Sequence, residues 1–281
     1  MRLTSVRWRS FLLVILGWGG LAGAAAQTAL VLVPDGRLLA PDIARIVIRG
    51  ELIVALLNKD TPPFVQEKNG VLSGVDIELM QKVAQELKVP IRFERTATTY
   101  DGVAMRVAGG HADLGVSKLA RTFKRAQSVL FSTPYMHLEH ALLINRLAFA
   151  KVAGDQPVSQ AVRNFNGTIG VLAGSSWEEF VVRNFTKASP VRFAAWDQAV
   201  DAVKKGVVVA AYRDAVEVRS VMRSDPSLAL KLRTVTFSDL ASVLCVVVGP
   251  NDTVLKSFVD EVVANQREKL TVNLLLKQME R

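Results

Sequence analysis

The chain has 281 residues, of which 50% are apolar and 22% are charged, and its formal net charge is +9. This balance is typical of a globular protein and excludes a disordered, collagen-like or low-complexity chain, while the length predicts more than one domain. The single cysteine, Cys245, excludes an intrachain disulfide, and with only three histidines we expect neither a metal site nor a cofactor.

The first 26 residues have the pattern of a cleaved secretory signal. Three arginines precede an apolar run at 11–21 that is too short to span a bilayer comfortably, and small residues with an Ala-x-Ala site lead to Gln27. An uncleaved membrane anchor is the alternative. Cleavage would remove the three arginines, lower the formal net charge to +6 and place the protein in the bacterial periplasm. The remaining basic residues are scattered, so we expect no nucleic-acid partner.

The chain from Leu52 onward is predicted to alternate between strands and helices, because short apolar runs alternate with segments of helical spacing. The first elements expected are a strand at Leu52–Leu57, a helix at Val75–Leu87, a strand at Ile91–Glu94, a helix from Thr98 or Thr99 to about Ala108, and a strand at Leu114–Ser117. The same order then recurs, with strands at Thr168–Leu172, Val191–Phe193 and Val207–Tyr212, and with helices at Trp177–Phe185, from a cap at Asp197 to Gly206, and from about Asp214.

Two modules of this kind predict an α/β protein of two lobes, each with a mostly parallel sheet. A last strand at Leu244–Val248 and a helix from about Thr253 have no sheet of their own to complete, so we expect them to return to the first lobe. The expected organisation is a signal peptide at 1–26, lobe 1 at 27–138, lobe 2 at 139–239 and a return to lobe 1 at 240–281.

Common catalytic motifs are absent from the sequence, including GxSxG, GxxxxGK[ST], GxGxxG and HExxH. His137 and His140 lie three residues apart without a third ligand nearby, and a zinc site needs at least three protein ligands. Cys245 lies in an apolar run and is expected to be a small core residue.

Polar and aromatic side chains follow the predicted strands at their carboxyl ends, where open α/β sheets bind ligands. Two serines precede a predicted helix, whose N-terminus can bind an anion. The candidate site residues are Asn58 and Thr61 after the first strand, Tyr100 at the start of the second helix, Lys118, Ala120, Thr122 and Arg125 after the third strand, Ser175 and Ser176 before the helix at Trp177, and Asp214.

Five segments between about Gly50 and Met279 together resemble the family 3 bacterial extracellular solute-binding proteins: RGELIVAL, TPPF, GVLSGVDIELMQKVAQEL, ADLGVSKLARTFKRAQSVLFSTPY and GTIGVLAGSSWEEF. These are the polar amino acid-binding components of ABC importers. The resemblance implies the type II periplasmic-binding-protein fold, with two lobes that hinge around a ligand cleft. It also implies a monomer that binds an amino acid and delivers it to an ABC permease in the inner membrane.

The resemblance also implies a role for each candidate site residue. Arg125 would form a bidentate pair with the ligand α-carboxylate, and Asp214 would neutralise the α-ammonium. Ser175 and Ser176 would donate to the carboxylate from the second lobe. The other contacts would come from Lys118, Ala120 and Thr122 through backbone and hydroxyl groups, and from Asn58, Thr61 and Tyr100 around the ligand side chain. Alternatively, Arg125 would be a surface residue, and the serines and Asp214 would only cap helices.

Three residues depart from the family pattern. Thr61 stands where many relatives carry an aromatic residue that stacks on the ligand, and Lys118 and Ala120 replace positions that are often Gly and Ser or Thr. The added positive charge of Lys118 and Arg121 would suit an acidic ligand but does not establish one.

The leading interpretation is a binding protein without catalytic activity, with hinges near Tyr135–Leu143 and Thr236–Ser242. A periplasmic enzyme on the same scaffold, similar to the cyclohexadienyl dehydratases, is an alternative that would require a positioned general acid. An accessory or sensory binding subunit is another, because fold does not determine function. A lytic transglycosylase would need an added catalytic domain, for which we expect no room in this chain.

Overall fold

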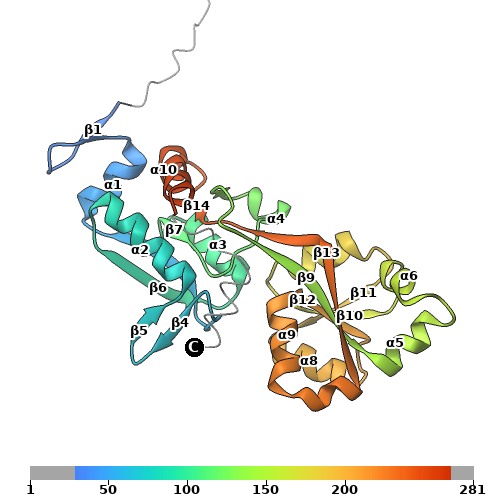
Figure 1. Cartoon of the computed structure of the whole chain (residues 1–281). Helices are drawn as coiled ribbons and strands as arrows, with labels where there is room; N and C mark the ends of the chain where they lie inside the picture. Colours follow the sequence, from blue (N-terminus) through green and yellow to red (C-terminus); the bar gives the residue numbers. More distant parts are fainter. Residues whose placement is uncertain (1–28, 267–281) are drawn as a thin grey trace, which may run out of the picture.

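Two five-stranded sheets organise the computed structural model, which describes residues 29–266 (Figure 1). The strand order is β6-β3-β7-β14-β8 in one sheet and β11-β10-β12-β9-β13 in the other. We call each sheet with its covering helices a lobe, the first being the one that contains β3. The predicted α/β fold with two lobes is confirmed.

The first lobe is built around β3 (Leu52–Leu57), which pairs in parallel with β6 (Ile91–Ala97) and β7 (Leu114–Gly115). All six side chains of β3 are buried, as in a strand that is covered on both faces. Alternate residues of β3 belong to two different cores, one shared with α2 (Val75–Leu87) and the other with α3 (Tyr100–Ala108). The two helices therefore cover opposite faces of the sheet.

The C-terminal segment completes the first lobe. β14 (Val247–Val248) pairs antiparallel with both β7 and β8 (Leu130–Phe131), and α10 (Thr253–Ala264) contacts α2 and α1 (Pro41–Arg49). Cys245, just before β14, is buried in the core, as predicted.

The second lobe has three parallel strands, β10 (Thr168–Leu172), β11 (Ser189–Phe193) and β12 (Ala210–Asp214). Two predictions here are wrong. The strand expected at Val207–Tyr212 starts and ends later, because residues 206–209 form a turn and bends, and Asp214 is its last residue. Asp197 does not cap its helix, because Ala195 is the N-cap and Asp197 lies in the first turn.

The helices of this lobe are α5 (Arg146–Ala153), α6 (Val158–Arg163), α7 (Trp177–Asn184), α8 (Trp196–Lys204) and α9 (Ala215–Ser224), followed by a 3₁₀ helix at Pro226–Leu230.

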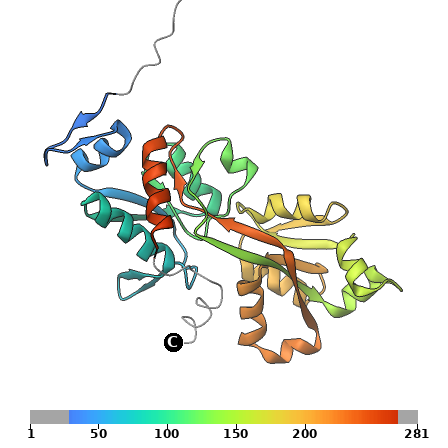
Figure 2. The same ribbon diagram turned by 45° about the horizontal axis from the view of Figure 1, so that its top comes forward.

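Two long antiparallel strands, β9 (Met136–Asn145) and β13 (Leu232–Leu244), join the lobes (Figure 2). Their register is interrupted by a bulge between Phe237 and Ala241. Hinge motion at these strands stays a prediction. The remaining elements are β1 (Val31–Leu32) paired with β2 (Leu38–Leu39), β4 (Gln66–Lys68) paired with β5 (Val71–Ser73), and α4 (Phe123–Ala126).

The predicted signal peptide at 1–26 and the last residues of the chain lie outside the described range. Within residues 29–266, no helix has the length and apolar character needed to cross a membrane.

Candidate functional site

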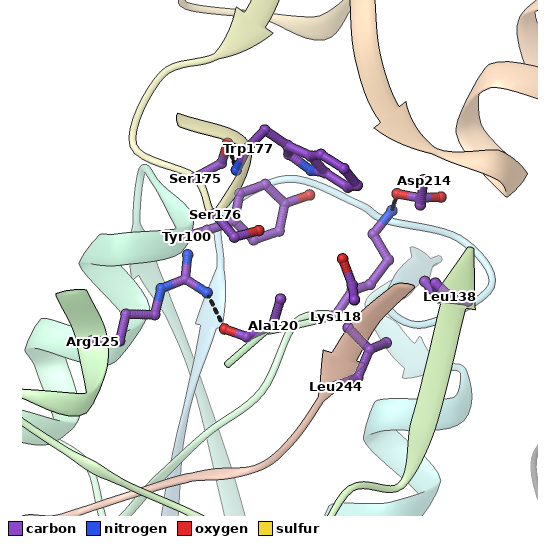
Figure 3. Close-up of a pocket in the computed structure, with 11 residues that line it drawn as sticks. Tyr100, Lys118, Ala120, Arg125, Leu138, Ser175, Ser176, Trp177, Asp214 and Leu244 are labelled. Carbon is purple, nitrogen blue, oxygen red and sulfur yellow. Dashed lines mark hydrogen bonds and ion pairs between the residues drawn. The ribbon is translucent and has the colours of Figure 1, made fainter. Parts of the chain in front are cut away.

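A small cavity of about 20 Å³ lies between the two lobes (Figure 3). Seven of the ten candidate site residues line it, together with residues of the connecting strands β9 and β13. The eleven lining residues are Tyr100, Lys118, Ala120 and Arg125 from the first lobe, Ser175, Ser176, Trp177 and Asp214 from the second, and Leu138, Ser242 and Leu244 from the connecting strands and their ends.

The lobes contact each other beside this cavity. The backbone N–H of Asp101 donates to the Gly174 carbonyl at 2.9 Å. The Glu179 carboxylate of α7 accepts hydrogen bonds from the backbone N–H groups of Phe123 and Lys124, at 3.0 and 3.1 Å. The two halves of the site are therefore held together in a closed arrangement.

The other three candidate residues lie elsewhere. Thr61 lines an adjoining, larger cavity of about 300 Å³ that shares Tyr100 with the first. Thr122 is the N-cap of α4 and accepts a hydrogen bond from the backbone N–H of Arg125. Asn58 is exposed and lines neither cavity, so the structure does not place it with the other candidates, and its contact with the ligand side chain stays a prediction. Its neighbour Leu57 lines the larger cavity instead, because adjacent side chains of an extended chain project to opposite sides.

Arg125 is buried at the edge of the cavity, with 4% of its surface exposed. Its Nε donates to Asp101 Oδ1 at 2.9 Å, and one terminal nitrogen, Nη1, donates to the Ala120 carbonyl at 2.8 Å. The other terminal nitrogen, Nη2, lies 2.9 Å from the same Asp101 oxygen but has no hydrogen-bond partner, because the angle is unfavourable. Arg125 is thus fixed in place at the cavity, and its role toward a ligand stays a prediction (Figure 3).

Lys118 reaches across the cavity to the second lobe. Its Nζ donates to Asp214 Oδ2 at 3.0 Å and to Glu217 Oε1 at 2.7 Å. Burial alone would lower the pKa of Lys118, but the two carboxylates raise it, so the side chain is a cation.

Arg213 completes this charged network from β12. Its Nη2 donates to Glu217 Oε1 at 3.3 Å and to the Tyr100 hydroxyl at 3.2 Å, and its guanidinium lies 5.2 Å from the centre of the Trp196 ring. Burial would raise the pKa of Glu217, but Lys118 and Arg213 lower it to about 2. Sequence reasoning missed Arg213 and Glu217, although Glu217 stands three residues after the helix cap Asp214, a spacing typical of a capping box.

Of the two roles that the sequence left as alternatives for Asp214, the structure shows the helix cap, and the ligand role stays a prediction. Asp214 caps α9, because its Oδ1 accepts from the Glu217 backbone N–H at 3.1 Å. Its other oxygen faces the cavity and is paired with Lys118. Ser175 and Ser176 both line the cavity but differ in their bonds. The Ser175 hydroxyl donates to the Leu172 carbonyl at 2.5 Å and accepts from the Trp177 backbone N–H at 3.3 Å, whereas Ser176 makes no side-chain capping bond.

Asp76, in the first turn of α2, holds the backbone that carries Lys118. The Lys118 N–H donates to Asp76 Oδ2 at 2.6 Å, and the Tyr135 hydroxyl donates to Asp76 Oδ1 at 2.8 Å. Burial raises the pKa of Asp76 to about 6. Ser117 and Lys118 have φ angles of 140° and 53°, a region that glycine adopts more easily. The carboxylate thus stabilises a turn that the side chains themselves disfavour.

His140 belongs to a buried aromatic cluster of the second lobe. Its ring nitrogens bond to the Tyr212 hydroxyl and, at 2.9 Å, to the Ser242 hydroxyl, and its ring packs edge-on against Trp177. Among residues 29–266 no group of three or more His, Cys, Asp or Glu side chains could hold a metal ion. Burial lowers the pKa of His140 to about 4.

This shift predicts that the protein loses stability as pH falls. Because the folded pKa is below the unfolded value of 6.5, the unfolded chain binds the proton more tightly, and the loss develops between pH 6.5 and about 4. It reaches about 3 kcal/mol at most, at 1.36 kcal/mol per pKa unit. Urea unfolding at several pH values should give a flatter profile for His140→Gln. The exposed His137 is the control, and His137→Gln should retain the parent profile. An unchanged profile in His140→Gln would contradict the assignment.

Comparison with known proteins identifies relatives of this fold. The family model for bacterial extracellular solute-binding proteins, family 3, matches residues 52–278. The chain is 25% identical to the L-cystine-binding protein TcyJ of Escherichia coli over 48% of each chain. It is 29% identical to membrane-bound lytic murein transglycosylase F of Alcanivorax borkumensis over 158 residues, which are 56% of this chain and 32% of that protein. The chain therefore spans about a third of the length of this relative.

Solved structures have the same architecture. The substrate-binding protein AbpA of Streptococcus pneumoniae, bound to L-arginine, superposes with a TM-score of 0.64 at 25% identity, over 84% of this chain and 95% of that one. The ancestral amino acid-binding protein AncCDT-1, a precursor of cyclohexadienyl dehydratase, also gives a TM-score of 0.64, at 23% identity over 84% and 97%. The chain thus belongs to the bacterial extracellular solute-binding proteins of family 3.

Proposed function

We propose that this protein captures a small amino acid-like solute by its carboxylate between the two lobes and delivers it to an ABC importer in the inner membrane. The observation that carries the proposal is Arg125, a buried guanidinium with an Nη2 group that has no hydrogen-bond partner at the cavity. A guanidinium presents a planar fork of donors that matches a carboxylate.

The remaining contacts follow from the positions of the lining residues. Ser176 would donate to the carboxylate from the second lobe, at the start of α7, where the helix dipole favours an anion. Ala120 would add backbone contacts. The larger cavity, with Thr61 and Tyr100 on its wall, would hold the rest of the ligand.

A thermal-shift screen tests this proposal. The panel contains the amino acids, small dicarboxylates, 2-oxo acids and prephenate, each added to the protein without residues 1–26. A ligand at 100 times its Kd stabilises the folded protein by about 2.7 kcal/mol, which raises Tm measurably. We expect at least one carboxylate to do so. The absence of any shift across the panel would overturn the proposal.

We propose binding rather than catalysis, although relatives of the chain include an enzyme and a precursor of one. A dehydratase needs a general acid at the substrate. The carboxyl groups of Asp214, which lines the cavity, and of its neighbour Glu217 are both paired with Lys118. The pKa of Glu217 is about 2, so this group is not suited to donate a proton near neutral pH. Incubation with prephenate, followed by NMR, should therefore leave it unchanged beyond the spontaneous rate.

We also propose export to the periplasm through a cleaved signal peptide, with the mature protein a monomer that begins at or near Gln27. The intact mass of the protein recovered from the periplasm tests this cleavage. A full-length chain in the membrane fraction would support the uncleaved anchor instead.

A further inference from the structure

Asp214 is the one acidic side chain among the eleven cavity-lining residues, and each of its two oxygens already accepts a hydrogen bond from the protein. Asp214 Oδ2 accepts from Lys118 Nζ at 3.0 Å, and Oδ1 accepts from the Glu217 backbone N–H at 3.1 Å. Glu217 itself is bound by Lys118 and Arg213. An ammonium group that enters this cavity therefore meets no carboxylate that lacks a partner among its lining residues.

The groups without partners around the site are mainly donors. Arg125 Nη2 and the Nε and Nη1 groups of Arg213 are buried and make no hydrogen bond, and Arg213 Nε lies only 3.9 Å from Asp214 Oδ2. The lining residues themselves carry two cations, Lys118 and Arg125, and one anion, while Asp101 and Glu217 pair with these cations from beside the cavity. A ligand cation would add positive charge and further donors, whereas a ligand anion would meet the donors that lack partners.

Lys118 is built into this position. Its side chain is 6% exposed, and its backbone N–H is held by Asp76. Its ammonium group lies 5.7 Å from the centre of the Phe64 ring. Moving it aside would break two ion pairs with buried or partly buried carboxylates and leave Arg213 as their remaining cation, at 3.3 Å from Glu217 and 3.9 Å from Asp214. A ligand ammonium would therefore have to displace the Lys118 ammonium from its position between Asp214 and Glu217.

We infer that the ligand is a small organic acid without an α-ammonium group, such as a 2-oxo acid, and that the Lys118 ammonium fills the place beside Asp214 that the ammonium of an amino acid would need. This inference rests on the proposed function, in which Arg125 binds the carboxylate of the ligand. The inference narrows the proposed ligand from any amino acid-like solute to organic acids that lack the α-ammonium group.

Calorimetry with matched pairs of ligands tests the inference. The pairs are phenylpyruvate with L-phenylalanine, 2-oxoglutarate with L-glutamate, and pyruvate with L-alanine, so that each pair differs at the α-carbon alone. We expect at least one 2-oxo acid to bind about 100-fold more tightly than its amino acid, which corresponds to about 2.7 kcal/mol at 1.36 kcal/mol per tenfold change.

Lys118→Gly should reverse this preference, because it frees Asp214 and because glycine suits the φ of 53° at this position. The amino acid of the pair should gain affinity by about tenfold or more, while the 2-oxo acid should gain none. Lys88→Gly is the matched control, because Lys88 has a φ of 61° and is exposed beyond the end of α2. It should leave both affinities unchanged. Lys118→Met tests the same loss of charge if the glycine variant does not fold.

The outcomes separate the inference from the proposed function. Parent protein that binds amino acids more tightly than their 2-oxo acids, and loses them in Arg125→Ala, would overturn the inference and leave the proposed function standing. A preference that Lys118→Gly and Lys118→Met both leave unchanged would also overturn it. If no carboxylate binds the parent, the proposed function itself fails.

Discussion

Arg125→Ala is expected to weaken binding of the best carboxylate ligand by about 10²–10³-fold, which is about 3–4 kcal/mol. In the closed cavity the ligand carboxylate is removed from water, and a buried charge that loses its partner costs about 3–5 kcal/mol. Arg125→Lys should also bind weakly, because an ammonium cannot replace the two parallel N–H groups of a guanidinium. Calorimetry of both variants measures the effect.

Lys124→Ala provides the matched control for this prediction. Lys124 is the residue before Arg125 in α4 and also pairs with Asp101, at 2.6 Å, but its side chain is 69% exposed. Lys124→Ala should change the affinity by less than about fivefold, because an exposed ion pair contributes at most about 1 kcal/mol. Circular dichroism should establish that each variant folds. If Arg125→Ala binds within threefold of the parent, Arg125 does not hold the carboxylate.

Asp76→Ala is expected to lower the free energy of unfolding by about 2–6 kcal/mol, because it leaves two buried donors, the Lys118 N–H and the Tyr135 hydroxyl, without their acceptor. Each such group costs about 1–3 kcal/mol. The turn with positive φ at Ser117 and Lys118 loses its support at the same time, so ligand binding should weaken as well. Urea unfolding measures the first effect and calorimetry the second.

Asp76→Asn is the control, because the amide oxygen can still accept from the Lys118 N–H and the amide nitrogen can donate to the Tyr135 hydroxyl. We expect it to lose less than half as much stability as Asp76→Ala. The asparagine also removes the buried negative charge whose burial raises the pKa of Asp76 to about 6. Equal stability of the alanine and asparagine variants would show that the two hydrogen bonds do not hold this turn.

The secondary structure was largely readable from the sequence, because the apolar spacing that defines a helix or a strand is local. The spacing predicted α2 at Val75–Leu87, and two hydroxyl residues predicted a cap for α3 at Thr98 or Thr99, of which Thr99 is the N-cap. The strand at Val207–Tyr212 was misplaced, because a β-branched run also fits the turn that precedes β12 at Ala210–Asp214.

The candidate site was predictable only in part. Residues after strand ends are brought together by the topology of a parallel sheet, so seven of the ten candidates meet in one cavity. Asn58 failed this rule, because the alternation of an extended chain turns its neighbour Leu57 toward the larger cavity instead.

The sequence by itself determined that a lysine stands at position 118 and an aspartate at position 214. Only the tertiary structure decided that they pair, since 96 residues separate them and they lie in different lobes. An ion pair depends on the distance between two side chains in space, which local periodicity does not encode. The same holds for Asp76, which the apolar pattern of α2 places in a helix but which the fold buries beneath the backbone of Lys118.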